Sequence, residues 1–147
     1  MTGVSIVIPA YNAERTLART LEACRAQSLP CEVVVADDGS TDSTPAIADR
    51  FGVKYLRQEN RGAAAARNLG WRAASGRYVL FTDSDCVPDR DWALTLVMLL
   101  DEGAGAAGGT YTLANPESLT ASCIHYEIQY RHARLPRSST SMRVSAF

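Results

Sequence analysis

The sequence lacks any long hydrophobic run. Its longest candidate, Trp92 to Leu100, has nine residues, half of the ~18 that a membrane-spanning helix needs, so we interpret it as a core helix. Met1 leads almost directly into a predicted strand, without the charged and then apolar stretch of a secretory signal. We therefore expect a cytoplasmic protein, with the inner face of the membrane as an alternative location.

The sequence also lacks cysteine pairs and an excess of charge. Its four cysteines form no C-x-x-C pair, so we expect reduced thiols and no zinc site. The net charge of -1 argues against broad nucleic-acid binding. With 46% hydrophobic and 21% charged residues, the composition is that of a folded chain rather than a disordered one. The length of 147 residues predicts one domain over residues 1–147.

Strand and helix patterns alternate along the chain. The predicted strands are short apolar runs, namely Val4–Ile8, Glu32–Ala36, Val53–Leu56, Tyr78–Phe81 and Ala106–Tyr111. The predicted helices lie between and after them, at Asn12 to about Gln27, Thr44 through Phe51, Arg61 to about Gly76, Asp91 through Leu100, and Ser118–Tyr130. This alternation predicts an α/β sandwich whose sheet is parallel or mostly parallel.

Local signals mark the ends and faces of these elements. Pro9 is expected to end the first strand, because proline cannot donate to a sheet. Asn12, Thr44 and Asp91 are predicted to cap helices. The spacing of Leu17, Leu21 and Cys24 predicts that the first helix has one buried face.

Two carboxylates follow the strand Tyr78–Phe81, in the stretch Thr82-Asp83-Ser84-Asp85-Cys86. Ligands bind at the carboxyl ends of the strands of a parallel sheet. Carboxylate oxygens suit Mg²⁺ or Mn²⁺, and these ions in turn hold phosphates. The pair is therefore a candidate metal site, and an ordinary turn in which aspartate caps the backbone is the alternative.

Five stretches together resemble the family 2 glycosyltransferases, which have the GT-A fold. They are Pro9-Ala10-Tyr11-Asn12, Asp37-Asp38-Gly39-Ser40-Thr41-Asp42, Arg61-Gly62-Ala63-Ala64-Ala65-Ala66-Arg67-Asn68, Thr82-Asp83-Ser84-Asp85 and Gly108-Gly109. The resemblance covers nearly the whole chain and implies a Rossmann-like, mostly parallel sheet flanked by helices. It also implies a nucleotide-diphosphate sugar donor, a divalent Mn²⁺ or Mg²⁺ ion, and sugar transfer with inversion, as in the biosynthesis of cell-envelope polysaccharides.

The resemblance assigns the nucleotide to the first two of these stretches. Pro9, Ala10 and Tyr11 would shape the pocket for the base and the ribose, although Tyr11 could equally be a half-buried core aromatic. Asp38 would accept the ring N–H of a uracil-like base, and a uridine nucleotide is therefore favoured. Gly39 would let the backbone approach the nucleoside closely. The alternative for residues 37–42, strongest for Asp42, is a turn that caps the following helix.

The resemblance assigns the diphosphate and the metal to the later stretches. Arg61 and Arg67 lie near a helix start, where they can reach the base or the phosphates. The alternative is that each is a solvated arginine paired with a nearby acid. Asp83 would face the ribose or the metal, and Asp85 would bind the metal directly. The ion would neutralise the charge that builds up on the leaving nucleotide.

Inverting transfer also needs a general base for the acceptor hydroxyl. In the family the base follows a segment that Ser145-Ala146-Phe147 resembles, so we expect it beyond Phe147 and regard the chain as truncated before it. Between Gly109 and Phe147 the carboxylates are Glu117 and Glu127, and neither matches the motif. We interpret Glu127 as a surface residue. His125, His132 and Cys123 lack the spacing of a closed metal-ligand set.

The sequence also leads to expectations about the partners of the protein and about competing functions. The donor is a nucleotide-diphosphate sugar and the acceptor a saccharide or a lipid-linked saccharide, while peripheral membrane association and a homo-oligomer are left open. The basic loop with Arg131, Arg134 and Arg137 is either solvated or contacts an acceptor phosphate or a lipid headgroup. A nucleotide-sugar-binding module without turnover is the main alternative function. A sugar nucleotidyltransferase is a weaker one, because such enzymes carry a glycine-rich basic loop where this chain has Pro9-Ala10-Tyr11-Asn12.

Overall fold

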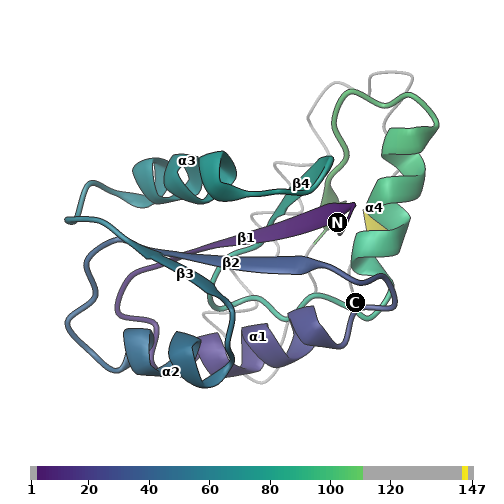
Figure 1. Cartoon of the computed structure of the whole chain (residues 1–147). Coiled ribbons are helices and arrows are strands. Elements are labelled where there is room, and N and C mark those ends of the chain that lie inside the picture. The colour runs from purple at the N-terminus through teal and green to yellow at the C-terminus, as the bar shows by residue number, and fades with distance from the viewer. Residues whose placement is uncertain (1–2, 111–143, 146–147) are drawn as a thin grey trace, which may run out of the picture. The chain divides into compact units, whose positions relative to one another are not determined.

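The computed structural model describes residues 3–110 and 144–145, and its main element is a four-stranded parallel sheet (Figure 1). The strands lie in the order β3-β2-β1-β4, and their bounds are Val4–Ala10 for β1, Glu32–Asp37 for β2, Lys54–Arg57 for β3 and Tyr78–Phe81 for β4. All three pairings between neighbouring strands are parallel. The prediction of an α/β fold with a parallel sheet is confirmed.

Helices cover both faces of this sheet. Helices α1 (Leu17–Arg25) and α2 (Thr44–Arg50) lie on one side, and α3 (Ala63–Ala73) lies on the other (Figure 1). The chain winds outward from β1 to β3 on the first side and then returns through α3, so that β4 pairs with the opposite edge of β1. The winding therefore reverses between β1 and β4, and the carboxyl ends of strands at such a reversal are where open α/β sheets bind ligands.

Close packing of α3 on the sheet explains the small residues in that helix. All seven residues of β1 are buried, as expected for a parallel strand that is covered on both faces. Ala66 is fully buried, and a Cβ atom added at Gly70 would overlap Cγ1 of Val7. The small side chains of α3 therefore let its backbone approach β1 and β2 closely.

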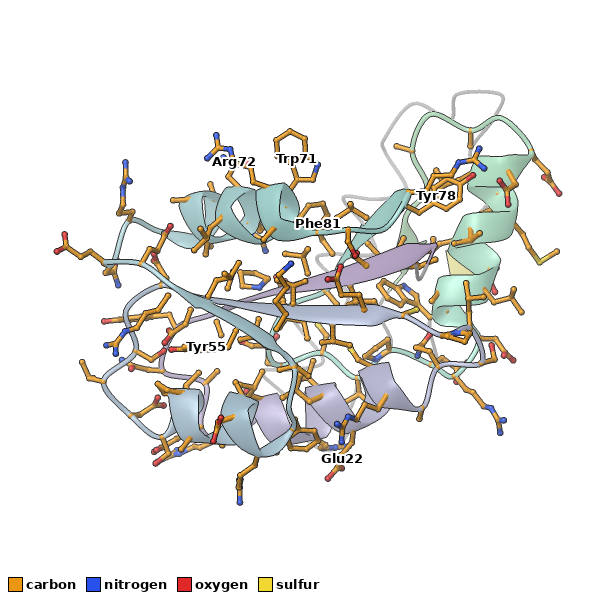
Figure 2. The ribbon with its side chains drawn as sticks, viewed as in Figure 1. Glu22, Tyr55, Trp71, Arg72, Tyr78 and Phe81 are labelled. Carbon is orange, nitrogen blue, oxygen red and sulfur yellow. The ribbon has the colours of Figure 1, made fainter. Side chains whose placement is uncertain are left out.

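Helix α1 has the predicted buried face. Leu17, Leu21 and Cys24 are all buried, whereas Glu22 points away from the sheet (Figure 2). Burial, and to a smaller degree the neighbouring Cys31, raises the pKa of the Cys24 thiol to about 12. Cys24 is therefore a neutral packing residue at physiological pH.

Three predicted boundaries were wrong. β1 continues through Pro9 to Ala10; β4 ends opposite Val7, so the missing N–H of Pro9 removes no sheet hydrogen bond on that side. Asn12 has a positive φ of 48° and does not cap α1, which begins only at Leu17. Thr44 lies inside α2, and its N–H donates to Oδ1 of Asp42 at 2.9 Å.

The chain divides into two compact units, Met1–Leu94 and Thr95–Phe147. Helix α4 (Trp92–Asp101) crosses this division. In the second unit, β5 (Gly109–Thr110), within the strand predicted at Ala106–Tyr111, pairs in parallel with β6 (Val144–Ser145). The predicted helix Ser118–Tyr130, which includes Cys123, lies outside the described residues, as do Glu117, His132 and the three arginines of the basic loop. Among the described residues, no helix has the length and apolar character that crossing a bilayer requires.

Candidate functional site

One pocket of about 960 Å³ opens at the carboxyl ends of β1, β2 and β4. Its wall includes the end of β1 and the residues after it, the loop after β2, the start of α3 and the stretch after β4. Most of the predicted site residues line it, namely Pro9, Ala10, Tyr11, Asp38, Arg67, Asp83 and Asp85. Tyr11 is 52% exposed, so it is not a core aromatic. The fold therefore assembles, in one place, residues that lie up to 76 positions apart in the sequence.

Asp37 and Asp38, adjacent in the sequence, have different surroundings. Asp37 is fully buried and does not line the pocket. Its Oδ1 accepts the N–H and the hydroxyl of Ser40 at 2.9 and 2.5 Å, and its Oδ2 accepts the hydroxyl of Tyr55 at 2.5 Å. Burial first, and then this bond to Asp37, raise the pKa of Tyr55. Asp37 therefore ties β2 to β3 and to the loop after β2, which leaves Asp38 as the aspartate of the pair that faces the pocket.

Asp38 joins the end of β2 to the start of α3. Its Oδ1 accepts hydrogen bonds from Nε2 of Gln58 at 2.6 Å and from the backbone N–H of Arg61 at 2.9 Å. Its Oδ2 accepts the N–H of Gly62 at 2.7 Å. Burial by itself raises the pKa of Asp38, but these hydrogen bonds and the Arg61 charge outweigh burial and hold the pKa below its ordinary value. An ionised carboxylate has about four acceptor positions, so Oδ2 keeps one for a ligand.

Gly39 and Arg61 do not line the pocket. Gly39 has a φ of 86°, and a Cβ atom there would lie 3.1 Å from the backbone N of Asn60. Glycine at this position thus makes room for residues 58–60 as they pass the end of β2. Arg61 contributes its backbone N–H and its charge to Asp38. A contact of either residue with a nucleotide stays a prediction.

Sequence reasoning missed how the loop after β1 is held. The N–H of Asn12 donates to Oγ of Ser40 at 2.9 Å, and Oδ1 of Asn12 accepts the N–H of Thr41 at 2.9 Å. The positive φ of Asn12 is therefore part of a turn that the loop after β2 supports. The available signal was Asn12 itself, since asparagine is enriched at positive φ.

Two further hydrogen bonds connect the same loops. The N–H of Ala13 donates to Oγ1 of Thr44 at 2.8 Å, and the N–H of Glu14 donates to Oδ2 of Asp42 at 3.0 Å. Burial by itself raises the pKa of Asp42, but hydrogen bonds, first those from Thr44, hold it below its ordinary value. Asp42 therefore has the turn-and-cap role that was its alternative in the sequence, and it also holds the pocket wall.

The stretch after β4 carries the candidate metal ligands. Nη2 of Arg67, on α3, forms an ion pair with Oδ1 of Asp83, and the two side chains are 40% and 46% exposed. Asp85 is exposed and lines the pocket. Among the described residues, no group of three or more His, Cys, Asp or Glu side chains could hold a metal ion. Two carboxylates fit an ion such as Mg²⁺ or Mn²⁺ that keeps several waters and takes its remaining ligands from phosphates.

The chain belongs to glycosyl transferase family 2, whose family model matches residues 5–141. It is 36% identical over 143 residues to the succinoglycan biosynthesis protein ExoO of Rhizobium meliloti, an alignment that covers 91% of this chain and 39% of ExoO. The predicted family is thus confirmed.

Two solved structures show the same fold. TarS residues 1–349 from S. aureus, in complex with UDP-GlcNAc, is 32% identical with a TM-score of 0.63, covering 69% of this chain and 32% of that one. The mannosyltransferase PcManGT from Pyrobaculum calidifontis, with GDP-Man and Mn²⁺, is 30% identical with a TM-score of 0.60, covering 76% and 35%. The fold is therefore that of the GT-A glycosyltransferases, as predicted. The chain spans less than half the length of each of these relatives.

Proposed function

We propose that this chain binds the nucleotide-diphosphate sugar of a glycosyltransferase, and that the protein transfers the sugar to a saccharide or a lipid-linked saccharide. The observation that carries this proposal is that Asp38 and the pair Asp83 and Asp85 line one pocket at the carboxyl ends of the strands. The UDP-GlcNAc bound to TarS and the GDP-Man and Mn²⁺ bound to PcManGT support a nucleotide sugar and a divalent ion.

A uridine nucleotide fits the Asp38 carboxylate better than a guanosine nucleotide does. Three protein donors already occupy its oxygens, and Oδ2 retains one acceptor position. The uracil ring has one N–H to donate, whereas the corresponding edge of guanine presents a ring N–H beside an amino group. One vacant acceptor position therefore matches uracil, and the GDP-Man complex of PcManGT makes guanosine the competing nucleotide.

Asp85 and Asp83 would hold the divalent ion, Mn²⁺ or Mg²⁺. When bound, the ion supplies charge neutralisation for the departing diphosphate. Arg67 uses one guanidinium nitrogen on Asp83, and its other N–H groups stay available for a phosphate oxygen, because the guanidinium carries five donors. Arg67 therefore adds positive charge near the proposed metal ligands, and the nucleotide base is assigned to Asp38.

We place the general base, which removes the acceptor proton, outside the described residues. The inversion of the sugar depends on this base and stays a prediction with it. Glu14, Asp38 and Asp42 line the pocket, but each accepts a hydrogen bond from a backbone N–H in the part of the pocket assigned to the nucleotide sugar. A nucleotide-sugar-binding module without turnover is therefore the second candidate function. Because proton removal by a positioned group is worth ~10² to 10⁴ in rate, a protein that binds the donor without such a base should form product slowly at best.

The cellular setting follows from the same proposal. Because nucleotide sugars are the proposed donors, we place the protein in the cytoplasm or, through peripheral association, at the inner face of the membrane. A homo-oligomer stays a prediction. The similarity to a succinoglycan biosynthesis protein supports a place in cell-envelope polysaccharide biosynthesis. In fractionated cells that express the protein, we expect to find it in the soluble fraction or in the fraction of peripheral membrane proteins. Protein that only detergent releases from the membrane would contradict this placement.

Calorimetry with UDP, GDP and dTDP, each with and without Mn²⁺, tests the donor assignment. We expect UDP to bind, and to bind more tightly with Mn²⁺. Glu22→Gln is the matched control, since Glu22 lies on the face of α1 that points away from the sheet (Figure 2). Absence of binding by all three nucleotides with Mn²⁺ present would contradict the proposed function, and tighter binding of GDP or dTDP than of UDP would contradict the base assignment alone.

A further inference from the structure

The stretch after β4 is attached to α1 and to the residues that follow this helix. Oγ1 of Thr20 donates to the carbonyl of Ser84 at 3.0 Å. Farther along, Gln27 bonds at both ends, with Nε2 donating to the carbonyl of Asp89 at 2.7 Å and Oε1 accepting the N–H of Ala93 at 2.9 Å. Helix α1 and Gln27, the second residue after it, therefore form a support along residues 84–93.

Thr20 is the anchor nearest the candidate metal ligands. It is fully buried on the same face of α1 as Leu17, Leu21 and Cys24. A buried hydroxyl is costly unless it is hydrogen-bonded, and this one bonds to the carbonyl of Ser84. Ser84 lies between the two carboxylates, and its carbonyl belongs to the peptide group that leads into Asp85, so the bond fixes the backbone beside that carboxylate.

Apart from the ion pair between Asp83 and Arg67, the surroundings of the two carboxylates do little to fix them. The side chain of Asp83 is 46% exposed and Asp85 is exposed, so core packing does not set the positions of these carboxylates. Within the stretch, the N–H of Cys86 donates to the carbonyl of Asp83 at 3.1 Å, which closes a turn around Ser84. The orientation of that turn relative to the pocket depends on what holds the Ser84 carbonyl.

We propose that Thr20 is a positioning residue that holds the turn Asp83–Cys86 in the orientation in which its carboxylates would hold a divalent ion. This inference rests on the proposed function and adds a residue from α1 to that site. Thr20 itself does not line the pocket. Its effect should therefore appear in the coupling between metal and nucleotide, and not in metal-free nucleotide binding at the Asp38 end.

The test uses Thr20→Val, which keeps the shape and removes the hydroxyl. A neutral hydrogen bond is typically worth a factor of about two to ten in an equilibrium constant. We expect the gain in UDP affinity on adding Mn²⁺, measured by calorimetry, to fall by about fivefold, with metal-free affinity within about twofold of the wild type. Thr20→Ser restores the hydroxyl and should restore the gain. Thr20→Ala serves where valine against the Ser84 carbonyl prevents folding.

Two control variants separate positioning from a general loss of stability. Ser5→Ala also removes a fully buried hydroxyl, one that bonds Glu32 and the N–H of Gly76 at the amino ends of the strands, away from the pocket. Gln27→Met removes the downstream attachment of the same segment. Both should lower the melting temperature and keep the full Mn²⁺ gain. A full gain in Thr20→Val, or an equal loss in Ser5→Ala, would overturn the proposal.

A measurement without nucleotide distinguishes this inference from the function on which it rests. The Cys86 backbone N–H should exchange with solvent about threefold to tenfold faster in Thr20→Val, because its turn has lost its anchor, and at the wild-type rate in Ser5→Ala. Unchanged Cys86 exchange in Thr20→Val overturns the anchoring itself. Wild-type protein that binds no nucleotide overturns the proposed function, and the positioning role with it, even where Cys86 exchange has changed.

Discussion

Two acidic loops at the same edge of the sheet are constructed in opposite ways. At the end of β2 and in the loop after it, Asp37 and Asp38 are at most 3% exposed, and their oxygens accept hydrogen bonds from this loop, from β3 and from the residues before α3. In the loop after β4, Asp83 pairs with Arg67 at the surface, and Asp85 is exposed. The two loops line one pocket, so the contrast lies within a single site.

The difference follows from the cost of burying a charge. A buried carboxylate must be paired and hydrogen-bonded to stay ionised, and the groups that satisfy it become fixed in place. Asp37 and Asp38 therefore organise the loops around them. An exposed carboxylate has no such desolvation cost, and its lone pairs stay available to an ion or a ligand. The β2 loop is thus the framework of the pocket, and the β4 loop supplies its metal ligands.

The largest expected effect comes from the framework. Asp37→Ala leaves the Ser40 N–H and the Tyr55 hydroxyl without their buried acceptor, so we expect the free energy of unfolding to fall by about 3 kcal/mol. Urea denaturation measures this loss. A loss no greater than that of Asp85→Ala would remove the contrast between the two loops.

Asp38→Ala should affect both stability and binding. The N–H groups of Arg61 and Gly62 lose their acceptor, which we expect to cost about 2 kcal/mol of stability. The base also loses its acceptor, so UDP affinity should fall in the absence of metal as well as in its presence. Denaturation and calorimetry on the same preparation measure the two effects. A stable variant with weaker UDP binding would show that Asp38 acts only on the ligand.

Asp85→Asn should affect binding alone. The change removes a charged ligand and keeps the shape, so Mn²⁺-dependent nucleotide binding should weaken at least tenfold, or ~1.4 kcal/mol. The free energy of unfolding should change by less than about 0.5 kcal/mol, as for other exposed positions. Calorimetry with and without Mn²⁺ is the measurement, and an unchanged metal dependence would remove Asp85 from the metal site.

The smallest effect concerns pH. The folded-state pKa of Asp38 lies below its ordinary value of 3.8, so the folded protein binds this proton less readily than the unfolded chain. Its contribution to stability is therefore complete above about pH 5 and is lost as pH falls through 3.8 toward the lower folded pKa. Urea denaturation from pH 6 to pH 3 should show a shallower decline in Asp38→Asn than in the wild type. Equal slopes would contradict this role for Asp38.

The order of elements was predictable because it depends on local patterns. The bounds of β4 were predicted correctly, since an apolar run followed by two aspartates leaves little choice. The buried face of α1 followed from its spacing. The wrong cap at Asn12 has a different origin: its side chain had a competing partner, Thr41, 29 residues away. No local pattern reveals such a partner.

The sequence by itself determined the alternation of strands and helices, the family and the residue types at the ends of the strands, because these depend on periodicity and on motifs of a few residues. Only the tertiary structure decided which aspartates organise the site and which remain available to a ligand. Asp37, Asp38, Asp83 and Asp85 look alike as residues of a loop. They differ in burial and in the donors that reach them from β3, α3 and the loops, and those donors come together only when the sheet has formed.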